Sequence, residues 1–189
     1  MKIGVLALQG AFIEHKFILE ELGCQVIELR NKNDLTAELD GIVLPGGEST
    51  VQGKLLKELK MFEGLKQMIQ NGKPVLATCA GLILLADKIE NDSAVHLGTL
   101  PVKVVRNAYG RQLGSFYTEN DFSDSGKIPM TFIRAPYISE ISPGVKVLSS
   151  VNGKITAVQY KNQMALSFHP ELNTDRTVHK KFIEMCIAA

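Results

Sequence analysis

The sequence has no tryptophan, few cysteines and no long apolar run. Its longest apolar stretches, at residues 3–8 and 82–86, fall far short of the roughly 18 residues that a membrane-spanning helix needs. Charged residues at 14–16 interrupt the apolar pattern near the start, which argues against a secretory leader. We therefore expect a cytoplasmic protein that is not embedded in a membrane.

The three cysteines, Cys24, Cys79 and Cys186, lie far apart and form no Cys-x-x-Cys pair. This spacing argues against a disulfide framework and against a cysteine-based zinc site. We expect no bound metal, and we interpret Cys24 and Cys186 as packing residues.

Neither sign of charge is in excess, because 21 Lys and Arg residues stand against 20 Asp and Glu residues, for a net charge of +1. Such a chain has no broad attraction for a nucleic-acid backbone or an anionic membrane surface, so we expect neither as a partner. The length of 189 residues, with 45% hydrophobic residues, favours a single globular domain over residues 1–189.

The first half of the sequence alternates between strand and helix patterns. Apolar residues at helical spacing predict a helix over residues 11–22 and one long helix that ends at Asn71 and Gly72. Between the helices lie apolar runs typical of buried parallel strands, which together predict a doubly wound α/β fold. The strand candidates span residues 2–8, 25–29, 41–44 and 74–78.

After about residue 97 the pattern changes to short strand candidates separated by Gly, Pro, Asn and Ser. A last strand at residues 164–168 and an amphipathic helix after Asp175 follow. The expected fold is α/β: a doubly wound, mostly parallel sheet with an antiparallel extension. The candidates for this extension span residues 102–105, 114–117, 130–133, 145–148 and 156–160.

Cys79 stands between a strand and a helical pattern, which predicts a sharp turn that lifts the thiol clear of the sheet. The small residues Ala77 and Gly81 would let the strand and the helix approach closely. The helix N-terminus favours a thiolate, and the Ala80 N–H would point to where an oxyanion forms. A lone cysteine is more often a small buried hydrophobic residue, so a nucleophilic Cys79 requires a base.

His169 is the best candidate for that base, because it ends the last predicted strand and is followed by Pro170 and Glu171. Pro170 favours an extended backbone at His169, in which residues two apart point the same way. Glu171 would then lie beside the imidazole, fix its tautomer and stabilise its protonated form. The alternative is that this segment only turns the chain.

The other three histidines carry no predicted chemistry. His15 falls near the apolar stripe of the first helix and is interpreted as a core-edge residue. His96 and His179 have no acidic residue at a sequence spacing that would place a carboxylate beside the ring.

Gly46 and Gly47 lie between a strand and a helix, where the backbone can come close to a ligand and direct N–H groups at a carbonyl oxygen. A backbone N–H group of this loop is a candidate for the second hydrogen-bond donor to the oxyanion. The sequence has neither the phosphate-binding G-x-x-x-x-G-K-[ST] spacing nor the dinucleotide-binding G-x-G-x-x-G spacing, and we expect no cofactor.

Six segments together resemble the glutaminase subunits of pyridoxal 5′-phosphate synthase, which are class I (triad-type) glutamine amidotransferases with a flavodoxin-like fold. The cysteine turn and HPE are shared by the whole class, whereas GGEST with RNAYGRQ and IRAP is specific to this subunit. The segments are LALQG at 6–10, GGEST at 46–50, TCAGL at 78–82, RNAYGRQ at 106–112, FIRAP at 132–136 and SFHPEL at 167–172.

The resemblance implies hydrolysis of L-glutamine to L-glutamate and ammonia. It makes Cys79 the nucleophile, His169 the proton shuttle and Glu171 the residue that orients His169, with oxyanion donors at Gly47 and Ala80. The glutamine-binding residues that it implies are Gly46, Gly47, Glu48, Arg106, Ile133 and Arg134.

The resemblance also implies a partner, the barrel-shaped synthase subunit that uses the ammonia for pyridoxal 5′-phosphate (vitamin B6) biosynthesis. The two subunits would form a large hetero-oligomer with twelve copies of each. Two alternatives stay open: another cysteine-dependent amide or γ-glutamyl hydrolase, and a non-catalytic module that senses glutamine or redox state. A sensor has no need of a strained turn, a base and an orienting acid together, which favours an enzyme.

Overall fold

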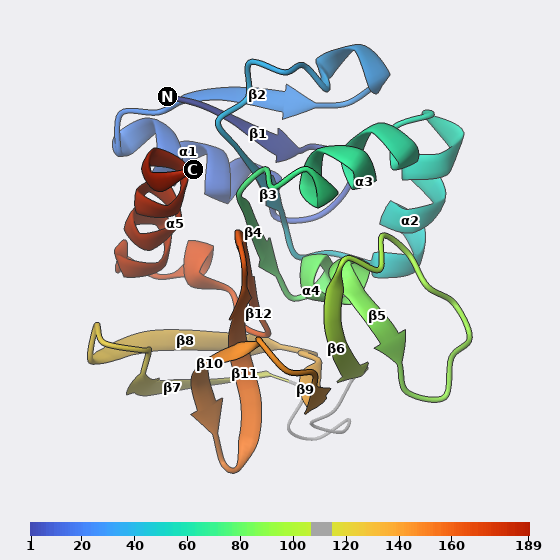
Figure 1. Ribbon diagram of the computed structural model, residues 1–189. Helices are drawn as coiled ribbons and strands as arrows, with labels where there is room; N and C mark the ends of the chain where they lie inside the picture. The colour runs from blue at the N-terminus through green and yellow to red at the C-terminus, as the bar shows by residue number, and fades with distance from the viewer. Residues whose placement is uncertain (107–114) are drawn as a thin grey trace.

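The computed structural model describes residues 1–106 and 115–189 (Figure 1). Within these residues, one large sheet has the strand order β2-β1-β3-β4-β12-β11-β9-β6-β5, and β10 pairs with β11. A separate two-stranded sheet contains β7 and β8. The strands are β1 (Lys2–Leu6), β2 (Gln25–Leu29), β3 (Gly41–Leu44), β4 (Val75–Thr78), β5 (Ala86–Ile89), β6 (Leu100–Val105), β7 (Ser115–Asp121), β8 (Lys127–Ile133), β9 (Tyr137–Ile141), β10 (Lys146–Val151), β11 (Lys154–Tyr160) and β12 (Gln163–Leu166).

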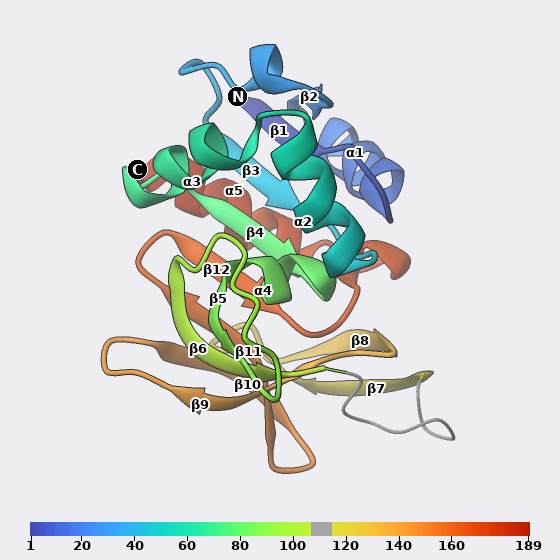
Figure 2. The same ribbon diagram turned by 90° about the vertical axis from the view of Figure 1, so that its right-hand side faces the viewer.

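The five adjacent strands β2, β1, β3, β4 and β12 run parallel to one another. Figures 1 and 2 show α1 and α5 on one face of this region and α2, α3 and α4 on the other. This confirms the predicted doubly wound arrangement. The helices are α1 (Phe12–Glu21), α2 (Ser49–Glu58), α3 (Phe62–Gln70), α4 (Ala80–Leu85) and α5 (Thr177–Ala188).

The parallel strands β1, β3, β4 and β12 are buried on both faces, because each face supports its own hydrophobic core. On β3, Ile42 and Leu44 belong to the core beneath α2, α3 and α4, whereas Val43 belongs to the core beneath α1 and α5. Successive side chains of a strand point to opposite faces, so an unbroken apolar run supplies both cores.

The antiparallel extension is present, since β12 pairs with β11, β11 with β9 and β9 with β6 in antiparallel fashion. Two strands of this region, β5 and β9, were absent from the predicted set. β7 and β8 form a hairpin outside the main sheet. Gly114, which the prediction placed at the start of a strand, lies outside the described residues.

The single long helix predicted up to Asn71 is wrong, because the chain forms two helices, α2 and α3. Lys60 has a positive φ of 55°. The Met61 N–H bonds to Leu56 O at 2.9 Å and the Lys60 N–H to Lys57 O at 3.1 Å, the pattern of a Schellman helix end. Glycine usually occupies the left-handed position, and lysine there leaves no signal in the sequence.

None of the helices in the described part of the chain has the length and apolar character needed to cross a membrane.

A substitution of Gly81 should destabilise the protein. A Cβ at Gly81 would overlap the backbone carbonyl of Leu44, so the approach of α4 to β3 depends on glycine. We expect Gly81→Ala to lower the free energy of unfolding by about 1–3 kcal/mol in urea denaturation. Gly64→Ala, in α3, is the matched control, because its new methyl group would meet only the flexible end of the Leu35 side chain. Equal stability of the two variants would contradict the packing argument.

Candidate active site

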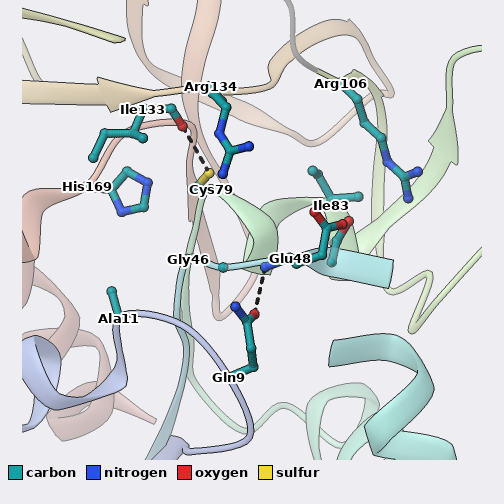
Figure 3. A pocket seen from close by; sticks show the side chains of 12 residues that line it. Gln9, Ala11, Gly46, Glu48, Cys79, Ile83, Arg106, Ile133, Arg134 and His169 are labelled. Carbon is teal, nitrogen blue, oxygen red and sulfur yellow. Dashed lines mark hydrogen bonds between the residues drawn. The ribbon is translucent and has the colours of Figure 1, made fainter. Parts of the chain in front are cut away.

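A pocket of about 310 Å³ lies beyond the carboxyl ends of β3, β4 and β12, in the middle of the parallel region (Figure 3). Open α/β sheets bind ligands at such ends, and this volume is near the lower end of the range for small-molecule sites. Its lining contains most of the predicted site residues. The lining residues are Gln9, Ala11, Gly46, Gly47, Glu48, Ser49, Cys79, Ile83, Arg106, Ile133, Arg134 and His169.

Cys79 occupies a strained turn between β4 and α4, as predicted. Its φ of 48° and ψ of −99° lie outside the regions that non-glycine residues normally adopt. A hydrogen bond from its N–H to Leu166 O, 2.8 Å long, holds this turn against the end of β12. The Sγ atom lies 3.9 Å from Ile133 O, to which the thiol donates (Figure 3).

His169 and Glu171 form a buried pair. The Nδ1 atom of His169 lies 2.7 Å from Glu171 Oε1, and the Glu171 side chain has no exposed surface. The backbone N–H of His169 donates to Thr131 O of β8 at 2.8 Å, which positions the ring.

The predicted proximity of His169 and Glu171 is present, but the backbone that produces it differs from the prediction. Pro170–Leu172 forms a short 3-10 helix, η2, instead of continuing as an extended chain. Proline starts such a turn readily, because its φ is already suitable and its missing N–H is not needed there.

The electrostatic surroundings keep the His169 ring protonated. Burial lowers the pKa of His169, but hydrogen bonds and charge interactions with Cys79 and Glu171 outweigh burial and raise it to about 10. A histidine next to a cysteine is the arrangement by which proteins commonly activate cysteine as a nucleophile.

The Gly46–Gly47 loop packs directly on the His169 ring. A Cβ at Gly46 would overlap the His169 ring, so glycine is required for this contact. The Gly46 N–H donates to Thr78 Oγ1 at 3.0 Å, and Gly46 O accepts from Ala11 N at 3.0 Å. Both ends of Gly46 are therefore fixed, its N–H by the last residue of β4 and its carbonyl by the N-cap residue of α1.

Gln9 braces the next part of the loop. Its Oε1 atom accepts the Glu48 N–H at 2.7 Å (Figure 3). A Cβ at Gly47 would overlap that same oxygen. Gln52 Nε2 donates to Gln9 O at 2.9 Å, so α2 holds Gln9 in turn. Sequence reasoning assigned Gln9 no role, although it lies in the LALQG segment.

Two arginines line the pocket at the side opposite the glycine loop (Figure 3). Arg106 Nη1 forms an ion pair with Asp92 Oδ2 at 2.9 Å. Arg134 has a positive φ of 44°. Residues 107–112, the remainder of the RNAYGRQ segment, lie outside the described residues.

The interpretation of His15 as a core-edge residue is wrong. His15 is fully buried, and its Nε2 atom lies 3.3 Å from Glu171 Oε2. His179 is equally buried, and its Nε2 atom lies 2.9 Å from His15 Nδ1. These contacts join residues far apart in sequence, and no local motif signals them.

Within the described residues, no cluster of three or more His, Cys, Asp or Glu side chains is arranged to hold a metal ion.

Comparison with known proteins places this geometry in a family. The model of the SNO glutamine amidotransferase family matches residues 5–188. The chain is 62% identical to the pyridoxal 5′-phosphate synthase subunit PdxT of Desulfitobacterium hafniense (strain Y51), covering 97% of this chain and 92% of that one. It is 56% identical to PdxT of Haemophilus influenzae (strain PittEE), with 100% of both chains covered.

Solved structures agree with the fold. A crystal structure described as a glutamine amidotransferase matches with a TM-score of 0.92 and 39% identity over 97% of this chain and 98% of that one. The structure of PurLQS from Thermotoga maritima matches with a TM-score of 0.69 at 18% identity, covering 99% of this chain and 97% of that one. At this low identity, the match to PurLQS concerns the fold alone.

The protonation of His169 can be measured by NMR of its ring nuclei. We expect a midpoint near pH 10, and Glu171→Gln should lower it towards 6.5 because the neutral amide removes the carboxylate charge. Since the folded-state pKa is raised, the associated stability is fully present below pH 6.5 and is lost as the pH rises through about 10.

His96 is the internal control for this titration. Burial lowers the pKa of His96, so its midpoint should lie below 6.5 in both proteins. A His169 midpoint near 6.5 in the unmodified protein would disprove the described pairing.

Proposed function

The chain belongs to the SNO glutamine amidotransferase family, and from this we propose that the pocket around Cys79 is where it binds and hydrolyses L-glutamine. The protein is a glutaminase whose ammonia serves pyridoxal 5′-phosphate synthesis. One observation carries the assignment of the site: a thiol on a strained turn lies in a pocket with a protonated histidine that a buried carboxylate holds. The family match does not favour the alternative hydrolase or the sensor.

In the proposed reaction, Cys79 Sγ attacks the side-chain amide carbon of glutamine. His169 donates its proton to the leaving ammonia and then takes a proton from the water that hydrolyses the thioester. Glu171 keeps Nδ1 of the ring engaged, so the other ring nitrogen is available for this transfer.

Two backbone N–H groups are proposed to stabilise the oxyanion of the tetrahedral intermediate. Ala80 opens α4 directly after the nucleophile, where the N–H groups of a helix have no partner within the helix. Gly47 lies across the pocket in the glycine loop. The brace from Gln9 to Glu48 fixes the orientation of the peptide next to Gly47.

Charged residues around the pocket are proposed to hold the two ends of glutamine. Guanidinium groups suit a free α-carboxylate, which supports Arg106 and Arg134 as its partners. Glu48 suits the α-ammonium group. The backbone of Gly46, Gly47 and Ile133 completes the proposed glutamine site.

Free ammonia is mostly protonated in water at neutral pH and is then no longer nucleophilic, so it must be passed directly to its acceptor. The relatives are named as subunits of pyridoxal 5′-phosphate synthase. We propose a complex with the synthase subunit, in a hetero-oligomer with twelve copies of each chain.

We also propose that residues 1–189 form a single glutaminase domain, since both cores pack on one sheet. A cytoplasmic location is proposed as well. All three cysteines are free in the structure, which suits a reducing compartment.

Ammonia release from glutamine, asparagine and γ-glutamyl peptides, with and without the synthase subunit, tests the function. We expect release from glutamine, loss of that activity in Cys79→Ala and labelling of Cys79 by a diazo-ketone glutamine analogue. Cys24→Ala is the matched control and should remain active, because Cys24 packs in the core away from the pocket. No glutamine-dependent ammonia under either condition would refute the proposal.

The role of Arg106 can be separated from catalysis by steady-state kinetics. We expect Arg106→Gln to raise KM for glutamine at least about 10-fold, since a charged hydrogen bond contributes about 1.5–3 kcal/mol, with a smaller effect on kcat. Arg176→Gln is the control, because Arg176 pairs with Glu21 outside the pocket. An unchanged KM in Arg106→Gln would remove Arg106 from the substrate site.

A further inference from the structure

Glu171 is held from both sides by imidazole rings. Its Oε1 atom pairs with His169 Nδ1 at 2.7 Å, and its Oε2 atom faces His15 Nε2 at 3.3 Å. The side chains of His15 and Glu171 have no exposed surface. The proposed reaction uses only the first of these contacts, which leaves a fully buried histidine against the second oxygen.

The direction of the hydrogen bonds follows from chemistry. Glu171 Oε2 has no hydrogen-bond partner among the described residues, so its 3.3 Å contact with His15 Nε2 is electrostatic. A lone pair on Nε2 would face the negative oxygen, which places the proton of His15 on Nε2. His15 Nδ1 is then an acceptor, and His179 Nε2 donates to it at 2.9 Å. Burial lowers the pKa of both His15 and His179, so each ring is neutral and carries one proton. His179 therefore donates to His15, whose protonated Nε2 faces Thr78 Oγ1 and the Glu171 carboxylate.

His15 Nε2 is also linked to the Gly46–Gly47 loop by way of the Thr78 side chain. His15 Nε2 lies 3.2 Å from Thr78 Oγ1, which accepts the Gly46 N–H at 3.0 Å. Thr78 directly precedes Cys79. A single buried ring therefore contacts the orienting acid and the hydroxyl that anchors the glycine loop.

We propose that His15 is a positioning residue for glutamine hydrolysis: it fixes Glu171 behind His169 and, through Thr78, holds the Gly46–Gly47 loop, while His179 selects its tautomer. This inference rests on the proposed function. His15 touches neither the pocket nor the reacting atoms, so it acts through Glu171 and Thr78.

The charges around this cluster set the expected pH response. Burial raises the pKa of Glu171, but the neighbouring His15 and His169 outweigh burial and lower it. Glu14 and Arg176 act on the rings of His15 and His179, respectively. If the His15 ring is removed, Glu171 should protonate at a higher pH, and the acid limb of the kcat profile should move to higher pH.

Steady-state kinetics of the complex with the synthase subunit tests the proposal, with variants His15→Leu and His15→Gln. We expect His15→Leu to lower kcat at least about 10-fold, because the variant loses both the contact with the Glu171 carboxylate and the buried hydrogen bond to Thr78, with KM within about twofold. Its acid limb should shift to higher pH. His15→Gln should recover most of the activity, because the glutamine amide can donate from near the position of Nε2.

Leu19→Ala is the matched control, since Leu19 is a fully buried residue one turn further along α1. It should lower the melting temperature while leaving kcat and the acid limb unchanged. A wild-type acid limb in His15→Leu, or an equal shift in Leu19→Ala, would overturn the proposal. If His15→Leu does not fold, His179→Leu takes its place, and an unchanged acid limb there would also overturn it.

The NMR midpoint of His169 separates this inference from the proposed function, because it needs no turnover. It should fall in His15→Leu and stay near the wild-type value in His15→Gln. An inactive wild-type complex with these NMR shifts would refute the glutaminase assignment alone. An active complex without them would refute the role of His15 alone.

Discussion

The active site depends on β4 being paired in parallel with β3 on one side and β12 on the other. In this register Leu44 lies opposite Ala77, and Leu166 lies opposite Thr78. The three strands therefore end at nearly the same level, and the segments that follow them are the glycine loop, Cys79 and His169. These short motifs, which are separated in sequence, meet in one site only because backbone pairing aligns the strand ends. The hydrogen bond from Cys79 N to Leu166 O extends that pairing into the turn itself.

The parallel half of the fold was predictable because its signals are local. Continuous apolar runs of four to seven residues are typical of strands with a core on each face, and the two cores observed explain them. The extension was harder to predict. The short strand β5 follows α4 without a turn signal, and the break between α2 and α3 falls at Lys60, where glycine would have marked it.

In the candidate site, too, the residues in local motifs were predictable and the others were not. Cys79, His169 and Glu171 stand in motifs where neighbouring residues explain their chemistry, so sequence reasoning reached them. His15 and His179 are 164 positions apart and meet only when α1 and α5 pack on one face of the sheet. Gln9 likewise meets Glu48 only because the ends of β1 and β3 are adjacent. Residues that contact a site from a distant part of the chain do not form a short sequence motif, so sequence reasoning cannot find them.

The strained backbone of Cys79 sets catalysis against stability at one residue. A non-glycine residue in such a conformation costs of order 1–3 kcal/mol. Glycine would adopt the same turn without that cost, but it would carry no thiol. If Cys79 is the nucleophile, as proposed, then a protein of this fold that did not need the thiol would be more stable with glycine at this position.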